Sequence, residues 1–223
     1  MKSMRYAVLV SLLFVSGCIV GDQLTTLTVH PDGSADLVVF RSNLHSTEKG
    51  EKGAKEIAKY KADFEKRVGD DFARIVEAGG KITSASWVRD QAPFSNVVHA
   101  HFAGPDVLEK YGLVNSPNEI VQVTTKFHRD GAQRSLTVHI TMSPDKLDVI
   151  RPAQQDAKKL RQRYASGISE TRIAVIGGSI TSARGFEVAR DDQSALLSSA
   201  EITEGLLSGK GNAEFYLKWD VTP

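Results

Sequence analysis

The sequence predicts an α+β fold in which antiparallel β-hairpins form a sheet and helices pack on one face of it. Two stretches alternate apolar and polar residues on either side of a tight turn, which is the pattern of a β-hairpin. A long amphipathic segment lies between them, and the remaining strand and helix patterns are interspersed. Because the strand pairs are joined as hairpins rather than through crossovers, we expect helices on an antiparallel sheet.

The first hairpin joins residues 24–30 to residues 34–40 across Pro31-Asp32-Gly33. Proline presets φ for a turn and glycine takes its left-handed position, which suits a three-residue loop. This register makes one face of the ribbon largely apolar. The expected pairs on that face are Thr25 with Val39, Leu27 with Leu37, and Val29 with Ala35.

The second hairpin joins residues 119–129 to residues 132–142 across Asp130-Gly131, a type I′ turn signal. One face is apolar and the other polar, as in a sheet with one side on a core and one side in water. The expected pairs on the apolar face are Val121 with Ile140, Val123 with Val138, and Thr125 with Leu136.

Between the hairpins, residues 54–77 predict one long amphipathic helix. Apolar residues recur three and four positions apart, and Lys and Glu residues alternate on the opposite, solvated face. Gly79-Gly80 ends the helix as a C-cap. Strands are expected at 81–89 and 96–103, joined by a turn that contains Pro93, and a short helix at 105–111.

After the second hairpin, Ser143-Pro144-Asp145 predicts a helix start, and Pro152 breaks that helix. A second helix is expected to end at Gly167, with a buried stripe made of Ala153, Ala157, Leu160 and Tyr164. The remainder predicts a strand at 171–176, a kink at Gly177-Gly178, a strand at 179–188, a helix near 192–207 and a closing strand at 213–219.

The N-terminus carries the pattern of an export signal. Lys2 and Arg5 precede an apolar run from Tyr6 to Val15, which has the length of a signal-peptide core. The run is too short for a membrane-spanning helix, which needs roughly 20 apolar residues. It ends in Val15-Ser16-Gly17-Cys18, which resembles the bacterial lipobox. The alternatives are an ordinary secretory signal, or a buried apolar helix, beside a chance cysteine.

The lipobox resemblance implies cleavage before Cys18, a diacylglyceryl thioether on its sulfur and an acyl chain on its freed amine. Two or more chains anchor a protein stably, whereas one does so only marginally. The sequence therefore predicts a membrane-anchored protein of the cell envelope that faces the periplasm. Ile19 and Val20 follow the cysteine, and the absence of aspartate at the second position favours the outer membrane.

We therefore divide the chain into a signal peptide at 1–17, a lipidated N-terminus with a short tether at 18–23, and a single exported domain at 24–223. An alternative interpretation splits this domain into two β-β-α-β-β-like halves with a break near residues 143–168. No second apolar run is long enough to span a bilayer, so the lipid is the only membrane attachment that the sequence predicts.

Composition narrows the class of protein. The chain has 28 basic and 27 acidic residues, and Lys2 and Arg5 leave with the signal peptide. A nearly neutral chain has no electrostatic footprint for nucleic acid, so we expect no nucleic-acid partner. The sole cysteine is taken by lipid, so the domain depends on its hydrophobic core without disulfides. No cofactor is expected beyond the covalent lipid.

Two stretches resemble a known family, residues 27–35 (LTVHPDGSA) and residues 173–185 (IAVIGGSITSARG). They are similar to the mycobacterial LppM-type lipoproteins and their relatives, which carry an early strand–Asp-Gly-Ser–strand and a late Pro-Gly kink before an Asn-Gly turn. Here Gly177 stands in place of that proline and Arg184 in place of that asparagine, and the C-terminal membrane helix of many relatives is absent. The resemblance implies an exported α+β module that interacts with envelope lipids, without catalytic residues.

The sequence contains no complete metal-binding, serine-nucleophile or phosphate-binding motif. His99 and His101 share a strand face, and His128 or His139 would be a third metal ligand, but zinc needs three or four well-placed ligands. Solvent-facing histidines are the simpler interpretation, so no metal site is predicted. Residues 177–181 lack the second glycine of a G-x-S-x-G elbow, and residues 205–210 are one residue short of a P-loop. No catalytic residue is predicted.

The leading hypothesis is a non-enzymatic envelope lipoprotein that binds a lipid or other hydrophobic ligand, or an envelope protein. A cavity between the long helix and the sheet would be lined by five aromatic residues, whose alternative role is plain core packing. These residues are Tyr60, Phe64, Phe72, Trp87 and Phe102. The alternatives are a structural or assembly subunit of an envelope complex, and a periplasmic hydrolase with a site dispersed in sequence.

Overall fold

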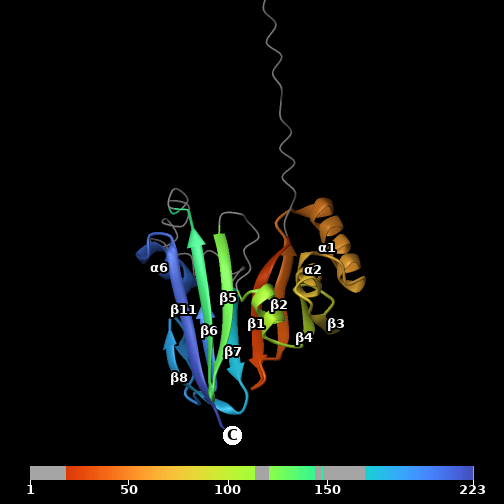
Figure 1. Cartoon of the computed structure of the whole chain (residues 1–223). Helices are drawn as coiled ribbons and strands as arrows, with labels where there is room; N and C mark the ends of the chain where they lie inside the picture. Colours follow the sequence, from red (N-terminus) through yellow and green to blue (C-terminus); the bar gives the residue numbers. More distant parts are fainter. Residues whose placement is uncertain (1–18, 114–120, 144–146, 148–168, 223) are drawn as a thin grey trace, which may run out of the picture.

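The protein has an α+β fold built on two β-sheets (Figure 1). The computed structural model describes residues 19–113, 121–143, 147 and 169–222. In this part of the chain the strands are β1 (Ile19–Val29), β2 (Ala35–Ser46), β3 (Lys81–Arg89), β4 (Phe94–Phe102), β5 (Val121–Asp130), β6 (Gln133–Met142), β7 (Ser169–Val175), β8 (Gly178–Arg184), β9 (Glu187–Val188), β10 (Ser194–Ser198) and β11 (Asn212–Val221). The helices are α1 (Gly50–Glu65), α2 (Asp70–Glu77), α3 (Pro105–Tyr111) and α6 (Ser199–Ser208).

Sheet A contains seven strands in the order β3-β4-β2-β1-β7-β10-β9, and sheet B contains four in the order β5-β6-β11-β8. The sequence predicts a single antiparallel sheet, so the division into two sheets is a correction. Strand β7 also pairs parallel to β1, with Leu27 opposite Ile173. Strands from before and after residues 143–168 share both sheets. The helices predicted between Ser143 and Gly167 lie outside the described residues.

The first hairpin forms the centre of sheet A, and its predicted register is confirmed. Thr25 pairs with Val39, Leu27 with Leu37 and Val29 with Ala35. Pairing extends further than predicted, because Ile19 lies opposite Ser46. Residues 19–23, which the sequence analysis assigns to a tether, are therefore part of β1.

The second hairpin forms as predicted, but its register is shifted by two residues. Val121 pairs with Met142, Val123 with Ile140 and Thr125 with Val138. The predicted turn places Asp130 at a central position with positive φ. In the structure Asp130 pairs with Gln133, and Gly131 takes the positive φ of +54°. Glycine alone accepts this conformation without steric cost, so it moves the turn by one residue and leaves the two faces unchanged.

The predicted helix at 54–77 is two helices, α1 and α2. The chain turns between them through Arg67 at φ +56° and Gly69 at φ +116°. Both helices bury one side, so the apolar periodicity continues across the break and hides it. The predicted C-cap is confirmed: the N–H groups of Gly79 and Gly80 donate to the carbonyls of Val76 and Ile75, which is a Schellman motif.

The helix expected near 192–207 is a strand followed by a helix. Ala195 and Leu197 are buried in β10, which pairs with β7. Ser198 then starts α6 through a capping box, in which its hydroxyl accepts from the Glu201 N–H and the Glu201 carboxylate accepts from the Ser198 N–H. This box is a sequence signal for a helix start, and it explains why α6 begins only at Ser199.

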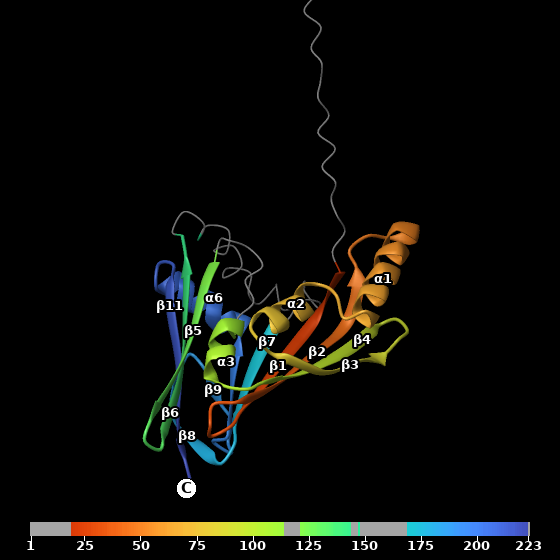
Figure 2. The same ribbon diagram turned by 45° about the vertical axis from the view of Figure 1, so that its right-hand side comes forward.

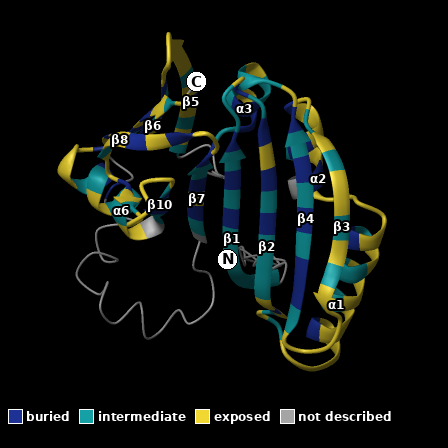
Figure 3. Ribbon diagram, turned by 90° about the horizontal axis from the view of Figure 1, so that it is seen from below, coloured by how far each residue is buried: buried dark blue, intermediate teal, exposed yellow. Residues whose placement is uncertain are grey.

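Alternation along the strands gives each sheet one buried face. Figure 3 shows buried and intermediate residues alternating along β1, β2 and β4, which lie side by side. Helices α1 and α2 pack on the buried face of sheet A, α3 contacts both β5 of sheet B and β4 of sheet A, and α6 contacts β11, β10 and β6 (Figure 2). The buried side chains of both sheets form one continuous cluster, which includes Phe102, Ile140, Ile173 and Trp219.

The tip of the first hairpin joins the two sheets. Gly33, at φ +90°, lies so close to α3 and β5 that a Cβ there would be 3.1 Å from Pro105 and 3.3 Å from Phe127. Arg134 is 4% exposed, and its guanidinium donates to the carbonyl oxygens of Pro31 at 3.1 Å, Gly131 at 2.7 Å and Gln133 at 3.0 Å. One side chain therefore connects the turns of both hairpins.

Helix α3 covers the outer edge of β5. A carboxylate oxygen of Glu109 accepts from the Phe127 N–H at 2.8 Å, and the other lies 3.1 Å from the Lys126 ammonium. Burial raises the pKa of Glu109, but these two hydrogen bonds and the Lys126 charge outweigh it, so the pKa lies below its ordinary value. An ionised carboxylate thus occupies an edge N–H that would otherwise be open to another strand.

We expect Arg134→Met to lower the free energy of unfolding by about 1.5–3 kcal/mol, because it removes the charge-assisted hydrogen bonds that the buried guanidinium donates to three carbonyls. Arg89→Met, at an exposed position at the end of β3, is the matched control and should change it far less. Chemical denaturation followed by circular dichroism measures both. Equal losses in the two variants would contradict the role given to Arg134.

Candidate ligand-binding site

An open hollow of about 780 Å³ lies at the end of sheet A where β1 begins. Three segments line it: the end of β2, the first turns of α1 and the β3–β4 turn. Most of the residue types that line it are apolar or glycine. The lining residues are Asn43, Leu44, His45, Ser46, Glu48, Gly50, Gly53, Ala54, Ile57, Ala92, Pro93 and Phe94.

A β-bulge in β2 places the floor of this hollow. The pairing passes from Asp22–Ser42 to Val20–His45, so Asn43 and Leu44 lie opposite the single residue Gly21. Asn43 has φ +53°, a left-handed conformation that asparagine accepts better than most residues. The extra residue reverses the alternation, so Leu44 is buried toward α1 at 3% exposure.

Gly21 is required opposite the bulge because the two strands approach closely there. A Cβ on Gly21 would lie 2.6 Å from the Ser42 carbonyl oxygen and 2.9 Å from Leu44 Cδ2. Real Cβ atoms do not come this close to other atoms, so any larger residue would displace the end of β2. The floor of the hollow therefore depends on this glycine.

Helix α1 forms one wall, and the loop before it holds that wall in place. A Cβ on Gly53 would collide with the Glu48 carbonyl oxygen, so the helix packs directly on the loop backbone. The Ser46 hydroxyl donates to the Glu56 carboxylate and accepts from the Glu48 N–H at 2.9 Å. Lys52 lies 2.8 Å from the Glu48 carboxylate. These contacts tie the first two turns of α1 to the end of β2.

The hollow lies beside the start of the described chain. Ile19 is directly opposite Ser46, and Ser46 lines the hollow. Residues opposite each other in an antiparallel pair project from the same face, so Ile19 is on the side of the sheet that carries α1. Cys18, the predicted lipidation site, lies outside the described residues and directly precedes Ile19 in the sequence.

The five aromatic residues predicted to line a cavity do not line this hollow. Four of them pack on one another between the helices and sheet A. Their ring centroids are 6.5 Å apart for Tyr60–Phe64, 5.5 Å for Phe64–Phe72, and 4.9 Å for Phe64–Trp87. Phe102 is fully buried and packs 5.0 Å from Tyr111. These contacts are those of a packed core, the alternative role considered from sequence.

Phe94 connects this aromatic cluster to the hollow and was missed from sequence. Its ring centroid lies 6.4 Å from that of Trp87, and it also lines the hollow. The Lys61 ammonium lies 5.4 Å from the Phe94 ring and 5.5 Å from the Trp87 ring, and it donates to the Asp90 carbonyl at 3.0 Å. The wall that contains Phe94 is therefore stabilised by contacts with the Trp87 ring and the Lys61 ammonium. The one sequence signal that pointed to this region was the predicted turn at Pro93, directly before Phe94.

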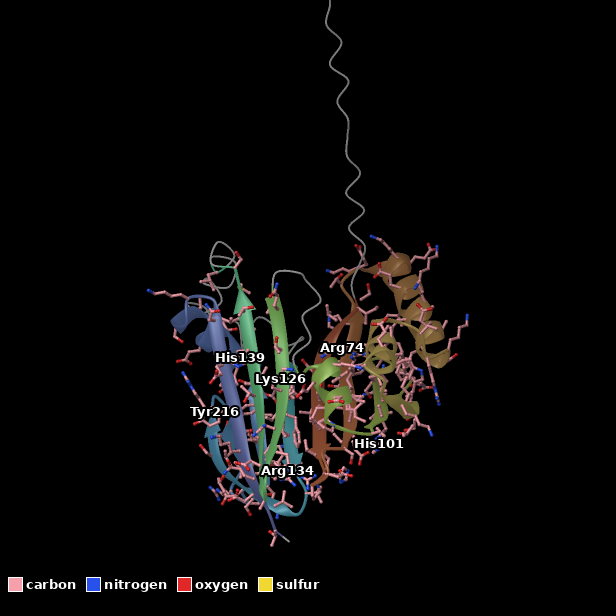
Figure 4. The ribbon with its side chains drawn as sticks, viewed as in Figure 1. Arg74, His101, Lys126, Arg134, His139 and Tyr216 are labelled. Atoms are coloured by element: carbon pink, nitrogen blue, oxygen red, sulfur yellow. The ribbon has the colours of Figure 1, made fainter. Side chains whose placement is uncertain are left out.

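The four histidines considered as metal ligands are divided between the two sheets. Figure 4 shows His101 on sheet A and His139 on sheet B, well apart, and His128 lies on β5 of sheet B. His99 is on the same face as His101 and opposite Val38. Among the described residues, no group of three or more His, Cys, Asp or Glu side chains is placed to hold a metal ion.

His101 instead belongs to a hydrogen-bonded trio on the open face of sheet A. The two carboxylate oxygens of Asp36 lie 2.9 Å from His30 Nε2 and 2.8 Å from His101 Nδ1. Hydrogen bonds from His101 and His30 hold the pKa of Asp36 below its ordinary value, and their charges act in the same direction. The trio lies outside the hollow.

In the part of the chain that the structure describes, the fold is α+β and an apolar depression lies beside the start of β1. No family model matches this chain, and neither does any curated protein at the level required of a match. Among solved structures it is similar to the NMR structure of the folded domain of LppM from Mycobacterium tuberculosis, with 14% sequence identity and a TM-score of 0.45 over 95% of each chain. This likeness says nothing about a ligand or a partner of the present chain.

Within the described ranges, no helix is both long enough and apolar enough to cross a membrane.

The Asp36 trio predicts an acid-dependent contribution to stability. Because the folded pKa lies below the ordinary 3.8, ionised Asp36 favours folding above that value and this contribution is lost as pH falls through the folded pKa. Asp36→Asn should lower the free energy of unfolding near neutral pH by at most about 1 kcal/mol, since its half-exposed side chain is screened by solvent.

Denaturant unfolding across the acid range measures this effect, with Asp130→Asn, at an exposed carboxylate at the end of β5, as control. The difference between wild type and Asp36→Asn should shrink to nothing in strong acid. A difference that is constant over the whole range would contradict the assignment.

Proposed function

We propose that this protein is a membrane-anchored lipoprotein of the bacterial cell envelope that binds a hydrophobic ligand and performs no catalysis. Its anchor is the lipid on Cys18, and its ligand site is the hollow. The observation that carries the proposal is the position of a largely apolar hollow of about 780 Å³ beside Ile19. This volume falls within the range of roughly 300–1,000 Å³ that is usual for small-molecule sites.

The lining suits the tail of a lipid better than a polar ligand. Leu44 at the floor and Ile57 and Phe94 on two walls supply apolar surface, the polar residues Asn43 and His45 are exposed, and the Glu48 carboxylate is paired with Lys52. Apolar surface that leaves water on binding is the main source of affinity for such a ligand. We propose the outer membrane as the location, with the domain in the periplasm.

A second candidate function is docking on an envelope complex. The face of sheet A opposite the helices carries a row of three half-buried apolar side chains, Leu24, Phe40 and Val97, which are neighbours across β1, β2 and β4. Half-exposed apolar rows on an open sheet are suited to a protein partner. This row supports the structural or assembly subunit as the alternative. The His101–Asp36 pair lies outside the hollow, so it does not favour the hydrolase.

Lipidation of Cys18 is tested by expression in a bacterium fed with labelled palmitate. We expect the wild-type chain to take up label, to lose residues 1–17 and to partition into detergent. Cys18→Ser removes the thiol and should abolish labelling. A wild-type chain whose mass shows cleavage before residue 18 without any added lipid would contradict the anchor.

Ligand binding is tested with cis-parinaric acid, a fluorescent fatty acid, added to the Cys18→Ser chain. We expect saturable binding that weakens at least about tenfold when Ala54→Trp fills the hollow, since Ala54 is exposed on its wall. Ala58→Trp, on an exposed turn of the same helix outside the lining set, should bind as the parent does. Equal affinity in the two tryptophan variants, with melting curves unchanged, would refute this site.

A further inference from the structure

The distance between the anchor and the hollow is set by the start of β1. Ile19 is already paired in the sheet, opposite a residue that lines the hollow. Consecutive Cα atoms are about 3.8 Å apart, so the Cα atom of residue 18 lies within that distance of the Ile19 Cα atom. Because residues 19–23 belong to a strand rather than to a flexible tether, the distance between residue 18 and the hollow cannot vary much.

The hollow is apolar along a path that begins at this rim. Ser46 is at the rim, Leu44 is buried at the floor, and Ile57 and Phe94 are half-buried on the walls beyond. The lining includes the Glu48 carboxylate, which is paired with the Lys52 ammonium at 2.8 Å, and Leu44, Ile57 and Phe94 offer apolar surface to an acyl chain that starts on residue 18.

Covalent attachment decides between this chain and a free lipid of the same chemistry. A ligand joined to the protein beside its site acts at an effective concentration in the millimolar range, without any additional contact. A separate lipid must compete with it from the bilayer. The attached chain is therefore the resting occupant that the geometry favours.

We propose that one acyl chain of the Cys18 lipid occupies the hollow and that it must leave before another hydrophobic ligand binds. This inference rests on the proposed function, and it adds the regulation of the same site. The other acyl chains of the anchor remain in the bilayer. The domain then binds a second lipid only when its own chain withdraws into the membrane.

The experiment uses a photoreactive diazirine fatty acid in two arrangements. In the first, the wild-type chain is made in cells fed with this fatty acid, so its own anchor carries the probe, and it is reconstituted in unlabelled nanodiscs. In the second, the wild-type and Cys18→Ser chains made without probe are placed in nanodiscs whose phospholipids carry it. Mass spectrometry locates the cross-linked residues after irradiation.

We expect the attached probe to cross-link within residues 43–57 and 92–94. The yield there should fall at least about fivefold in Ala54→Trp and should stay unchanged in Ala58→Trp, as expected for a chain inside the hollow. We also expect the bilayer probe to label the hollow of Cys18→Ser at least about fivefold more than that of the lipidated wild type. A chain outside the hollow would produce neither difference.

Two results would overturn the inference, and they are distinguishable. If the attached probe labels only bilayer lipid while the bilayer probe labels both chains equally in the hollow, self-occupancy is wrong and the ligand site stands. If neither arrangement labels the hollow, the ligand site itself is wrong, and self-occupancy falls with it.

Discussion

The antiparallel pairing of β1 with β2 is the constraint on which the rest of this structure depends. It sets Leu27 opposite Leu37 in the centre of sheet A, with β4 added on one side and β7 on the other. At one end, its turn packs on sheet B, where Arg134 binds the Pro31 carbonyl. At the other end, it holds Ile19 beside the hollow. One hairpin thus joins the two sheets and fixes where the chain enters the domain.

The hollow exists because this hairpin departs from regularity near its open end. A regular β2 would keep the odd-numbered alternation of Ala35, Leu37 and Val39, which would turn Leu44 away from α1. The bulge at Asn43 reverses the alternation, and Gly21 leaves the room that it needs. A bulge at a strand end is a common way to redirect a side chain toward a site. Here the redirected side chain becomes the apolar floor next to the proposed anchor.

Local signals in the sequence were sufficient for the parts that local chemistry decides. The Pro31-Asp32-Gly33 turn fixed the first register, and Gly79-Gly80 marked the end of α2. The parallel pairing of β1 with β7 joins segments more than a hundred residues apart, so no local pattern reports it. The hollow is likewise assembled from two stretches that are separate in sequence, residues 43–57 and 92–94. The aromatic residues were conspicuous by type, but their size also suits a packed core, and that is where they lie.

Because Ile19 lies beside the hollow, the proposed anchor on Cys18 would bring this end of sheet A to the membrane. The most direct measurement is paramagnetic broadening of amide NMR signals in nanodiscs that contain spin-labelled lipid, with the lipidated chain attached. The account predicts broadening at residues 43–57 and 92–94, and none at the opposite turns near Gly33 and Gly131. Broadening centred on those turns, or spread evenly over both sheets, would contradict it.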